Sequence, residues 1–118
     1  ENGWIPVSRT DLLTKFPNVY AIGDVSSVGV PKAGVFAEGA AKIAAASIIA
    51  AFNGQQNKSA YTGAGSCYIE FGEHQVARVD VDFFSGPKPF GVHYEASKAM
   101  AEDKEAFGSS RRARWFGL

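Results

Sequence analysis

The stretch from Phe16 to Glu38 constrains the fold most, because it joins a short apolar run, a glycine-rich loop and the start of a helical pattern. Val19 to Ile22 is typical of a buried strand that ends on Gly23-Asp24, and Gly34 opens a run of small residues. The first N–H groups of a helix have no intrahelical partners and can bind a nucleotide-type cofactor. We therefore expect either such a site or an ordinary strand-loop-helix connection.

Thr14 and the run Val19-Tyr20-Ala21-Ile22-Gly23-Asp24 resemble the second flavin-binding motif of the pyridine nucleotide-disulfide oxidoreductases, which are two-dinucleotide-fold flavoproteins. The continuation from Val30 to Glu38 is similar to sulfide:quinone oxidoreductases and to the flavoprotein of flavocytochrome c sulfide dehydrogenase. The resemblance implies an FAD cofactor whose ribityl hydroxyl donates a hydrogen bond to Asp24, with Gly23 allowing close approach. It also implies that Lys32, Gly34 and the following helix N-terminus bind near the flavin ring and favour negative charge there.

The composition is that of a globular domain. The chain has 118 residues, 12 basic and 12 acidic side chains and 46% hydrophobic residues. This balance argues against a nucleic-acid partner. No G-x-G-x-x-G motif is present, so the first phosphate-binding motif of a flavin fold lies outside the chain. The resemblance thus implies a C-terminal fragment, inactive and without FAD by itself, whose partners are the missing N-terminal FAD- and NAD-type domains.

The expected fold class is α+β: strand, loop and long helix, then a β-hairpin and a C-terminal helix. Residues 1–54 are expected to be the C-terminal part of the FAD-binding domain, with a helix from about Gly34 to Asn53 that Gly54 stops. A polar linker follows, and residues 60–118 form a hairpin-helix interface subdomain. Residues 1–8 are expected to hold a turn and a short edge strand, because Pro6 lacks a backbone donor.

Alternating polarity predicts the hairpin. One strand runs from Ser66 to Phe71, a turn covers Gly72-Glu73-His74, and the second strand runs on to Phe83. The predicted apolar face must be covered; its members are Cys67, Ile69, Phe71, Ala77, Val79, Val81 and Phe83. A second helix is expected from about Glu95 to Phe107, with Ala99, Met100 and Phe107 inward and a solvated face of Lys98, Glu102, Asp103, Lys104 and Glu105.

Cys67 has two interpretations. Its pattern favours a small buried hydrophobe with an inert thiol. The Cys67-Tyr68 pair also falls where the sulfide-oxidising flavoproteins carry one of two redox cysteines beside the flavin. The resemblance implies a catalytic Cys67 whose partner cysteine lies upstream, and a path for electrons from sulfide through FAD to a quinone or cytochrome. The following Ile69-Glu70-Phe71-Gly72 departs from the flavocytochrome type.

The remaining features do not define a catalytic site. His74 and His93 are too far apart to predict a metal site, so none is expected, and His74 is assigned to the turn. The tail from Arg111 to Leu118 combines arginines and aromatics; docking on the missing domain is favoured over peripheral membrane contact. The apolar segment from Ala40 to Ala51 is too short to span a membrane. The sequence does not predict the cellular compartment. Exposed surfaces are expected to promote self-association of the fragment.

Two alternative functions stay open. The chain could belong to a type II NADH:quinone dehydrogenase-like flavoprotein, in which Cys67 is part of the core. It could also be a non-catalytic dimerisation or interface module.

Overall fold

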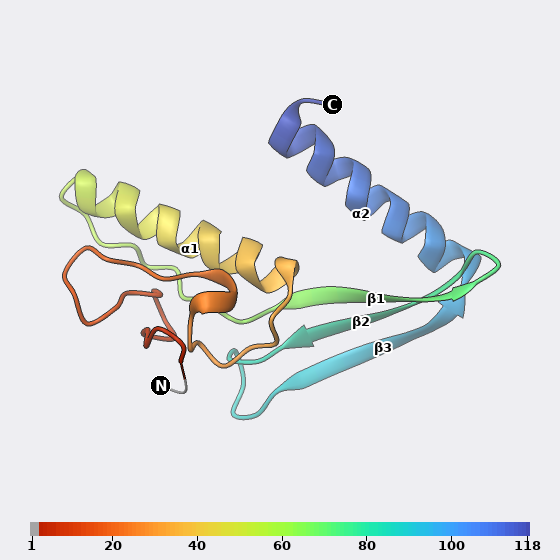
Figure 1. Cartoon of the computed structure of the whole chain (residues 1–118), viewed down its shortest axis with the longest axis horizontal. Coiled ribbons are helices and arrows are strands. Elements are labelled where there is room, and N and C mark those ends of the chain that lie inside the picture. Colours follow the sequence, from red (N-terminus) through yellow and green to blue (C-terminus); the bar gives the residue numbers. More distant parts are fainter. Residues whose placement is uncertain (1–2) are drawn as a thin grey trace. The chain divides into compact units, whose positions relative to one another are not determined.

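The computed structural model describes residues 3–118, which form two α-helices, a short 3-10 helix and a three-stranded antiparallel sheet (Figure 1). The predicted α+β class is confirmed. The chain divides into two compact units. Unit 1 comprises the described residues up to Gly65 together with Val81–Phe90, and unit 2 comprises Ser66–Asp80 and Gly91–Leu118.

Helix α1 (Gly34–Phe52) is the main element of unit 1, and its predicted bounds are confirmed to within a residue. Its buried residues follow helical spacing: Phe36, Ala40, Ala44 and Ser47. The helix ends as predicted, because Gly54 has a φ of +68° and the N–H of Gln55 then donates to the carbonyl of Ala50.

The core of unit 1 forms where α1 meets three loop segments. Leu12 is completely buried and clusters with Val28, Ala40 and Tyr61. The hydroxyl of Tyr61 donates a 3.1 Å hydrogen bond to the carbonyl of Phe36, which fixes the loop after α1 against the helix.

The predicted buried strand at Val19 to Ile22 is wrong. Tyr20 makes one isolated antiparallel bridge to Leu13, while Val19 and Ile22 are 49% and 37% exposed. A parallel strand is buried when neighbouring strands flank it, and the described residues supply none beside this run. The expected edge strand near the N-terminus is likewise reduced to a single parallel bridge between Ile5 and Ser26, and residues 1 and 2 lie outside the described residues.

The predicted hairpin is confirmed as strands β1 (Gly65–Gly72) and β2 (Gln75–Asp82). Glu73 and His74 form the turn with φ values of +50° and +58°, so the assignment of His74 to the turn is also confirmed. A third strand, β3 (Phe90–Ser97), lies beside β2 and gives the order β1-β2-β3.

Helix α2 (Lys98–Phe116) starts later than predicted, because Glu95 belongs to β3. It also ends later than predicted. Ser97 sets the start of the helix: its side chain accepts a 3.2 Å hydrogen bond from the N–H of Met100. The basic-aromatic tail is therefore the end of α2, capped by Gly117 with a φ of +68°.

The predicted orientation of α2 is partly wrong. Met100 and Phe107 are half-buried as expected, but Ala99 is exposed. Asp103 and Lys104, which were assigned to the solvated face, contact the sheet instead. No described residue of α2 is fully buried, so polar contacts contribute much of its attachment.

Helix α1 also corrects the expectation that no apolar segment is long enough to cross a membrane. With 19 residues it meets that requirement by length and composition, because the helix includes Gly34 to Gly39 and Phe52 in addition to the run first considered. A core helix of a soluble protein meets the same requirement, and α1 buries one stripe of residues in unit 1.

Candidate cofactor site

The Gly23-Asp24 pair lies in the 3-10 helix η1 (Gly23–Val25), against the start of α1. Gly23 has a φ of +71°, a conformation that favours glycine. A Cβ at this position would lie 3.6 Å from the Cβ of Ala37, an ordinary contact. The glycine is therefore required by backbone conformation, and it turns the chain so that Asp24 follows at the surface.

Asp24 is exposed, so its carboxylate, an acceptor-only group, is accessible to a ligand hydroxyl. Its neighbour Ser26 is completely buried and closes the turn, because the Ser26 hydroxyl donates a 2.9 Å hydrogen bond to the carbonyl of Gly23. The turn that presents the carboxylate is thus fixed by contacts within the loop.

Lys32 is held within the same loop. Its Nζ donates a hydrogen bond to the carbonyl of Ser26 and lies 4.3 Å from the centroid of the Trp4 ring. The ammonium group is therefore close to the turn that carries Asp24, but it is directed toward protein acceptors and an aromatic face.

Gly34 is the first residue of α1, and no side chain caps this end of the helix. Ala33, at the N-cap, accepts hydrogen bonds from the N–H groups of Phe36 and Ala37 with its carbonyl. The N–H groups of Gly34 and Val35 lie before Phe36 in the first turn of α1, where the N–H groups of a helix have no intrahelical partners. The positive end of the α1 dipole therefore lies in the segment that also holds Lys32.

Gly23, Asp24 and Lys32 line one small cavity together with Phe36 and Tyr61, so the structure brings three of the four predicted cofactor-binding residues together. The cavity has a volume of about 10 Å³, which is room for about one water molecule. A flavin ring does not fit inside it. Contact of this loop with a cofactor must therefore be made from outside the cavity, where Asp24 is exposed.

Cys67 lies on β1 in unit 2 and is exposed, so the interpretation of a buried hydrophobe is wrong. The predicted apolar face of β1 is open as well, with Ile69 at 45% and Phe71 at 64% exposure. The reason is that α2 packs over the opposite side of the strand, which carries Tyr68 and Glu70.

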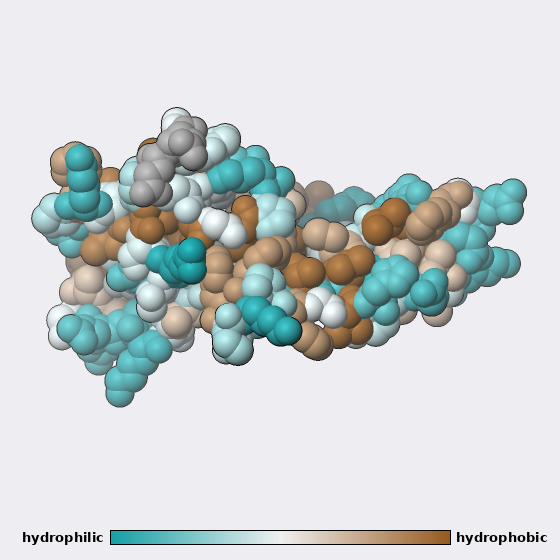
Figure 2. Space-filling model, turned by 90° about the horizontal axis from the view of Figure 1, so that it is seen from below, coloured by the Kyte–Doolittle hydropathy of each residue, from teal (hydrophilic) through white to brown (hydrophobic). Residues whose placement is uncertain are grey.

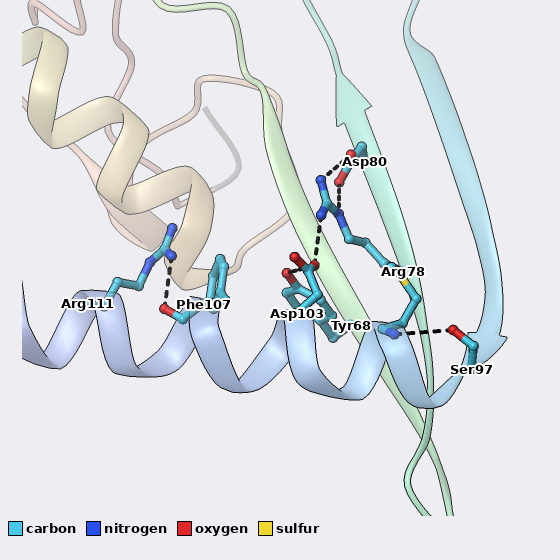
Figure 3. A network of polar contacts seen from close by, with 8 residues as sticks. Tyr68, Arg78, Asp80, Ser97, Asp103, Phe107 and Arg111 are labelled. Atoms are coloured by element: carbon cyan, nitrogen blue, oxygen red, sulfur yellow. Dashed lines mark hydrogen bonds and ion pairs between the residues drawn. The ribbon is translucent and has the colours of Figure 1, made fainter.

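A polar network joins α2 to the sheet, and the sequence did not predict it (Figure 3). The Tyr68 hydroxyl donates a 2.7 Å hydrogen bond to Oδ2 of Asp103, and Nη1 of Arg78 donates to the same oxygen at 2.8 Å. The Arg78 guanidinium also makes a bidentate pair with Asp80 at 2.7 and 2.6 Å. Residues from two strands and one helix therefore share one cluster, in which a single guanidinium pairs with two carboxylates.

The network shifts the pKa of each of its members. Burial, with the hydrogen bond to Asp103 second, raises the pKa of Tyr68 to about 12. Hydrogen bonds to Asp80 and Asp103 raise the pKa of Arg78. The pKa of Asp80 is lowered mainly by Arg78, and that of Asp103 mainly by the Tyr68 hydrogen bond. The aspartates stay ionised and Tyr68 stays neutral over the ordinary pH range.

One signal in the sequence could have indicated this network. Asp103 lies three residues after Met100 and four before Phe107, so it shares their helical face, and Tyr68 and Arg78 lie on the polar sides of the predicted hairpin strands. The assignment of Asp103 to the solvated face with Lys98, Glu102, Lys104 and Glu105 therefore missed the pairing.

Within residues 3–118, no cluster of three or more histidine, cysteine or acidic side chains has the geometry to hold a metal ion. Comparison of the chain with models of known protein families gives no match, and comparison with curated proteins gives none either.

Proposed function

We propose that this chain is the C-terminal part of an FAD-dependent oxidoreductase that passes electrons from a sulfur donor to a quinone or cytochrome. The observation that carries the proposal is the turn at Gly23-Asp24, which presents an exposed carboxylate beside Lys32 and the N-terminus of α1. An acceptor-only side chain suits a sugar-alcohol hydroxyl, and a positive helix end suits a ring that gains electrons.

These residues fit one arm of a flavin and do not form a complete site, because the cavity they line is too small for the ring. The upstream domains would hold the phosphates of FAD, and the exposed Asp24 would accept a hydrogen bond from the ribityl chain. FAD would supply the two-electron acceptor of the reaction. Lys32 would add positive charge near the ring after leaving its hydrogen bond to Ser26.

Cys67 would act in the sulfur step. Its exposure meets one requirement of thiol–disulfide exchange, which needs an accessible sulfur. Sulfide would attack a disulfide between Cys67 and an upstream cysteine, leaving a persulfide on one sulfur and a thiolate on the other. The exposure of Cys67 also favours this proposal over the NADH dehydrogenase-like alternative, which expected a core cysteine.

The first experiment measures FAD binding by a full-length polypeptide that contains this chain, using flavin absorbance and fluorescence during titration with FAD. Asp24→Ala should weaken binding on the order of tenfold, because a hydrogen bond to a charged group contributes about 1.5 kcal/mol. Glu102→Ala, which removes an exposed carboxylate in unit 2, is the matched control and should leave binding unchanged. A full-length protein that neither retains nor binds FAD refutes the proposal.

The second experiment compares electron donors in the FAD-loaded protein. Cys67→Ser should abolish sulfide-dependent reduction of the flavin while FAD binding is kept. If the wild-type protein is reduced by NADH and not by sulfide, the dehydrogenase-like alternative replaces the sulfide activity.

A further inference from the structure

Strand β3 presents an open edge. Its single neighbour among the described strands is β2, so the backbone groups on its other side have no strand partner within residues 3–118. Every residue from Phe90 to Ala96 is exposed. A row of unpaired N–H and C=O groups is a template for a further strand.

The sequence of β3 contains few of the features that protect sheet edges. Pro87, Lys88 and Pro89 precede the strand, and Phe90–Ser97 itself holds neither proline nor lysine. Val92 and Tyr94 remain 36% and 40% exposed, and the face seen from below in Figure 2 shows hydrophobic surface among hydrophilic residues. The edge therefore combines open backbone groups with apolar side chains.

We propose that β3 pairs antiparallel with β3 of a second copy of this chain, so that two three-stranded sheets become one continuous sheet. The two-fold axis passes beside Tyr94, which then faces its own counterpart. Gly91 to Ser97 of one copy lies along Ser97 to Gly91 of the other. This interface differs from the hairpin face of Ile69 and Phe71, which lies on another side of the sheet.

Complementary hydrogen-bonding groups set this register, because an imidazole N–H is a donor and a carboxylate is an acceptor. In one chain Nδ1 of His93 lies 3.4 Å from Oε1 of Glu95, which places both side chains on the same face of β3. Pairing centred on Tyr94 sets His93 of each copy directly opposite Glu95 of the other. Pairing centred on Glu95 would set two carboxylates face to face, and like charges directly opposite each other destabilise a sheet.

The second copy is a suitable partner because the strand is complementary to itself and the chain has a formal net charge of zero, so long-range repulsion does not oppose association. A single pair of strands buries less area than a standard protein interface. We therefore expect a reversible monomer–dimer equilibrium, with a Kd on the order of 10 to 100 µM.

Sedimentation velocity of the full 118-residue chain tests the proposal, with a reductant present so that the exposed Cys67 does not form disulfides. Glu95→Lys should raise the Kd by about tenfold or more, because a lysine then faces His93 and blocks the edge. The Glu95 side chain is 92% exposed, so the substitution leaves the monomer intact. Glu102→Lys makes the same charge change on the exposed side of α2 and should not alter the Kd.

A second variant tests the register. His93→Glu combined with Glu95→Lys sets a carboxylate directly opposite a lysine across the interface and should return the Kd to within about threefold of the wild-type value. Amide hydrogen exchange at low and high concentration should show concentration-dependent protection confined to residues 91–97. A chain that stays monomeric up to about 500 µM, equal effects of the Glu95 and Glu102 substitutions, or protection at residues 67–71 instead would each overturn the proposal.

Discussion

Removing the Tyr68 hydroxyl should loosen α2 from the sheet. This hydroxyl donates a 2.7 Å hydrogen bond to Asp103, while the Tyr68 ring packs edge-on against Phe107 with centroids 5.2 Å apart. Tyr68→Phe keeps the ring contact and the volume of the side chain. The substitution therefore isolates one charge-assisted hydrogen bond between β1 and α2.

Two magnitudes bracket the expected effect. The rise of the Tyr68 pKa from 10.0 to about 12 corresponds to about 2.7 kcal/mol between its neutral and ionised forms. Burial is the largest cause of that rise, and it penalises the ionised form without stabilising the neutral one, so this value is an upper bound. Hydrogen bonds to charged groups contribute about 1.5 to 3 kcal/mol, and partial exposure reduces the value. We expect Tyr68→Phe to lower the free energy of α2 opening by about 1 kcal/mol.

Amide hydrogen exchange of residues 98–107 measures this local opening directly. The amides should exchange about fivefold faster in Tyr68→Phe than in the wild-type chain. Tyr20→Phe, in unit 1, is the matched control: the Tyr20 hydroxyl makes no hydrogen bond to any residue from 3 to 118, so exchange in α2 should not change.

The effect should depend on pH in a defined direction. A pKa raised by folding gives stability that is fully present below pH 10.0 and is lost as the pH rises through about 12. The difference between wild-type and Tyr68→Phe chains should therefore be constant below about pH 9 and shrink above pH 10. Equal exchange of α2 in both chains at neutral pH would refute the assignment of the Tyr68–Asp103 bond as an attachment of this helix.

Two further predictions concern backbone conformation and acid. Gly23→Ala should lower the unfolding free energy by about 1 to 2 kcal/mol, because φ at this position is +71°. Gly34→Ala should raise the unfolding free energy by up to about 1 kcal/mol, because a Cβ at this position, at the start of α1, meets open space. Thermal denaturation followed by circular dichroism compares the two variants. The lowered pKa of Asp80 gives stability that is present above its ordinary value of 3.8 and lost as the pH falls through the lowered value, so protection of β2 should decrease below about pH 4. Asp80→Asn should make that acid transition less steep while Arg78 is unchanged, with the remainder due to Asp103, whose pKa is also lowered; an equally steep transition in the variant would contradict the assignment.

Local patterns predicted the elements that depend on short-range physics. Helix α1 has a continuous helical pattern and a glycine stop, and the β1–β2 hairpin has alternating strands about a turn, so both are confirmed. Val19 to Ile22 failed because a strand needs neighbours, which local sequence does not specify. The end of strand β3 was missed because Glu95 to Ser97 were included in the predicted helix, whereas the Ser97 cap decides where that helix begins.

The candidate site was predictable to the extent that its residues are close in sequence. Gly23, Asp24 and Lys32 belong to the same segment before α1, so their proximity in space follows from their proximity in the sequence. The exposure of Cys67 and the pairing of Asp103 with Arg78 depend on which side of the sheet α2 covers. That choice is made by contacts between elements distant in sequence, and hydrophobic alternation indicated the opposite side.

The attachment of α2 through polar contacts has a thermodynamic consequence. Because no residue of this helix is fully buried, its release exposes little apolar surface, and the heat capacity change of that step should be small. The release of α2 should therefore depend only weakly on urea concentration. Added salt weakens ion pairs, so it should promote release of α2 more than it promotes unfolding of the apolar cluster around Leu12. The chain contains two parts whose stabilities respond to different solvent variables.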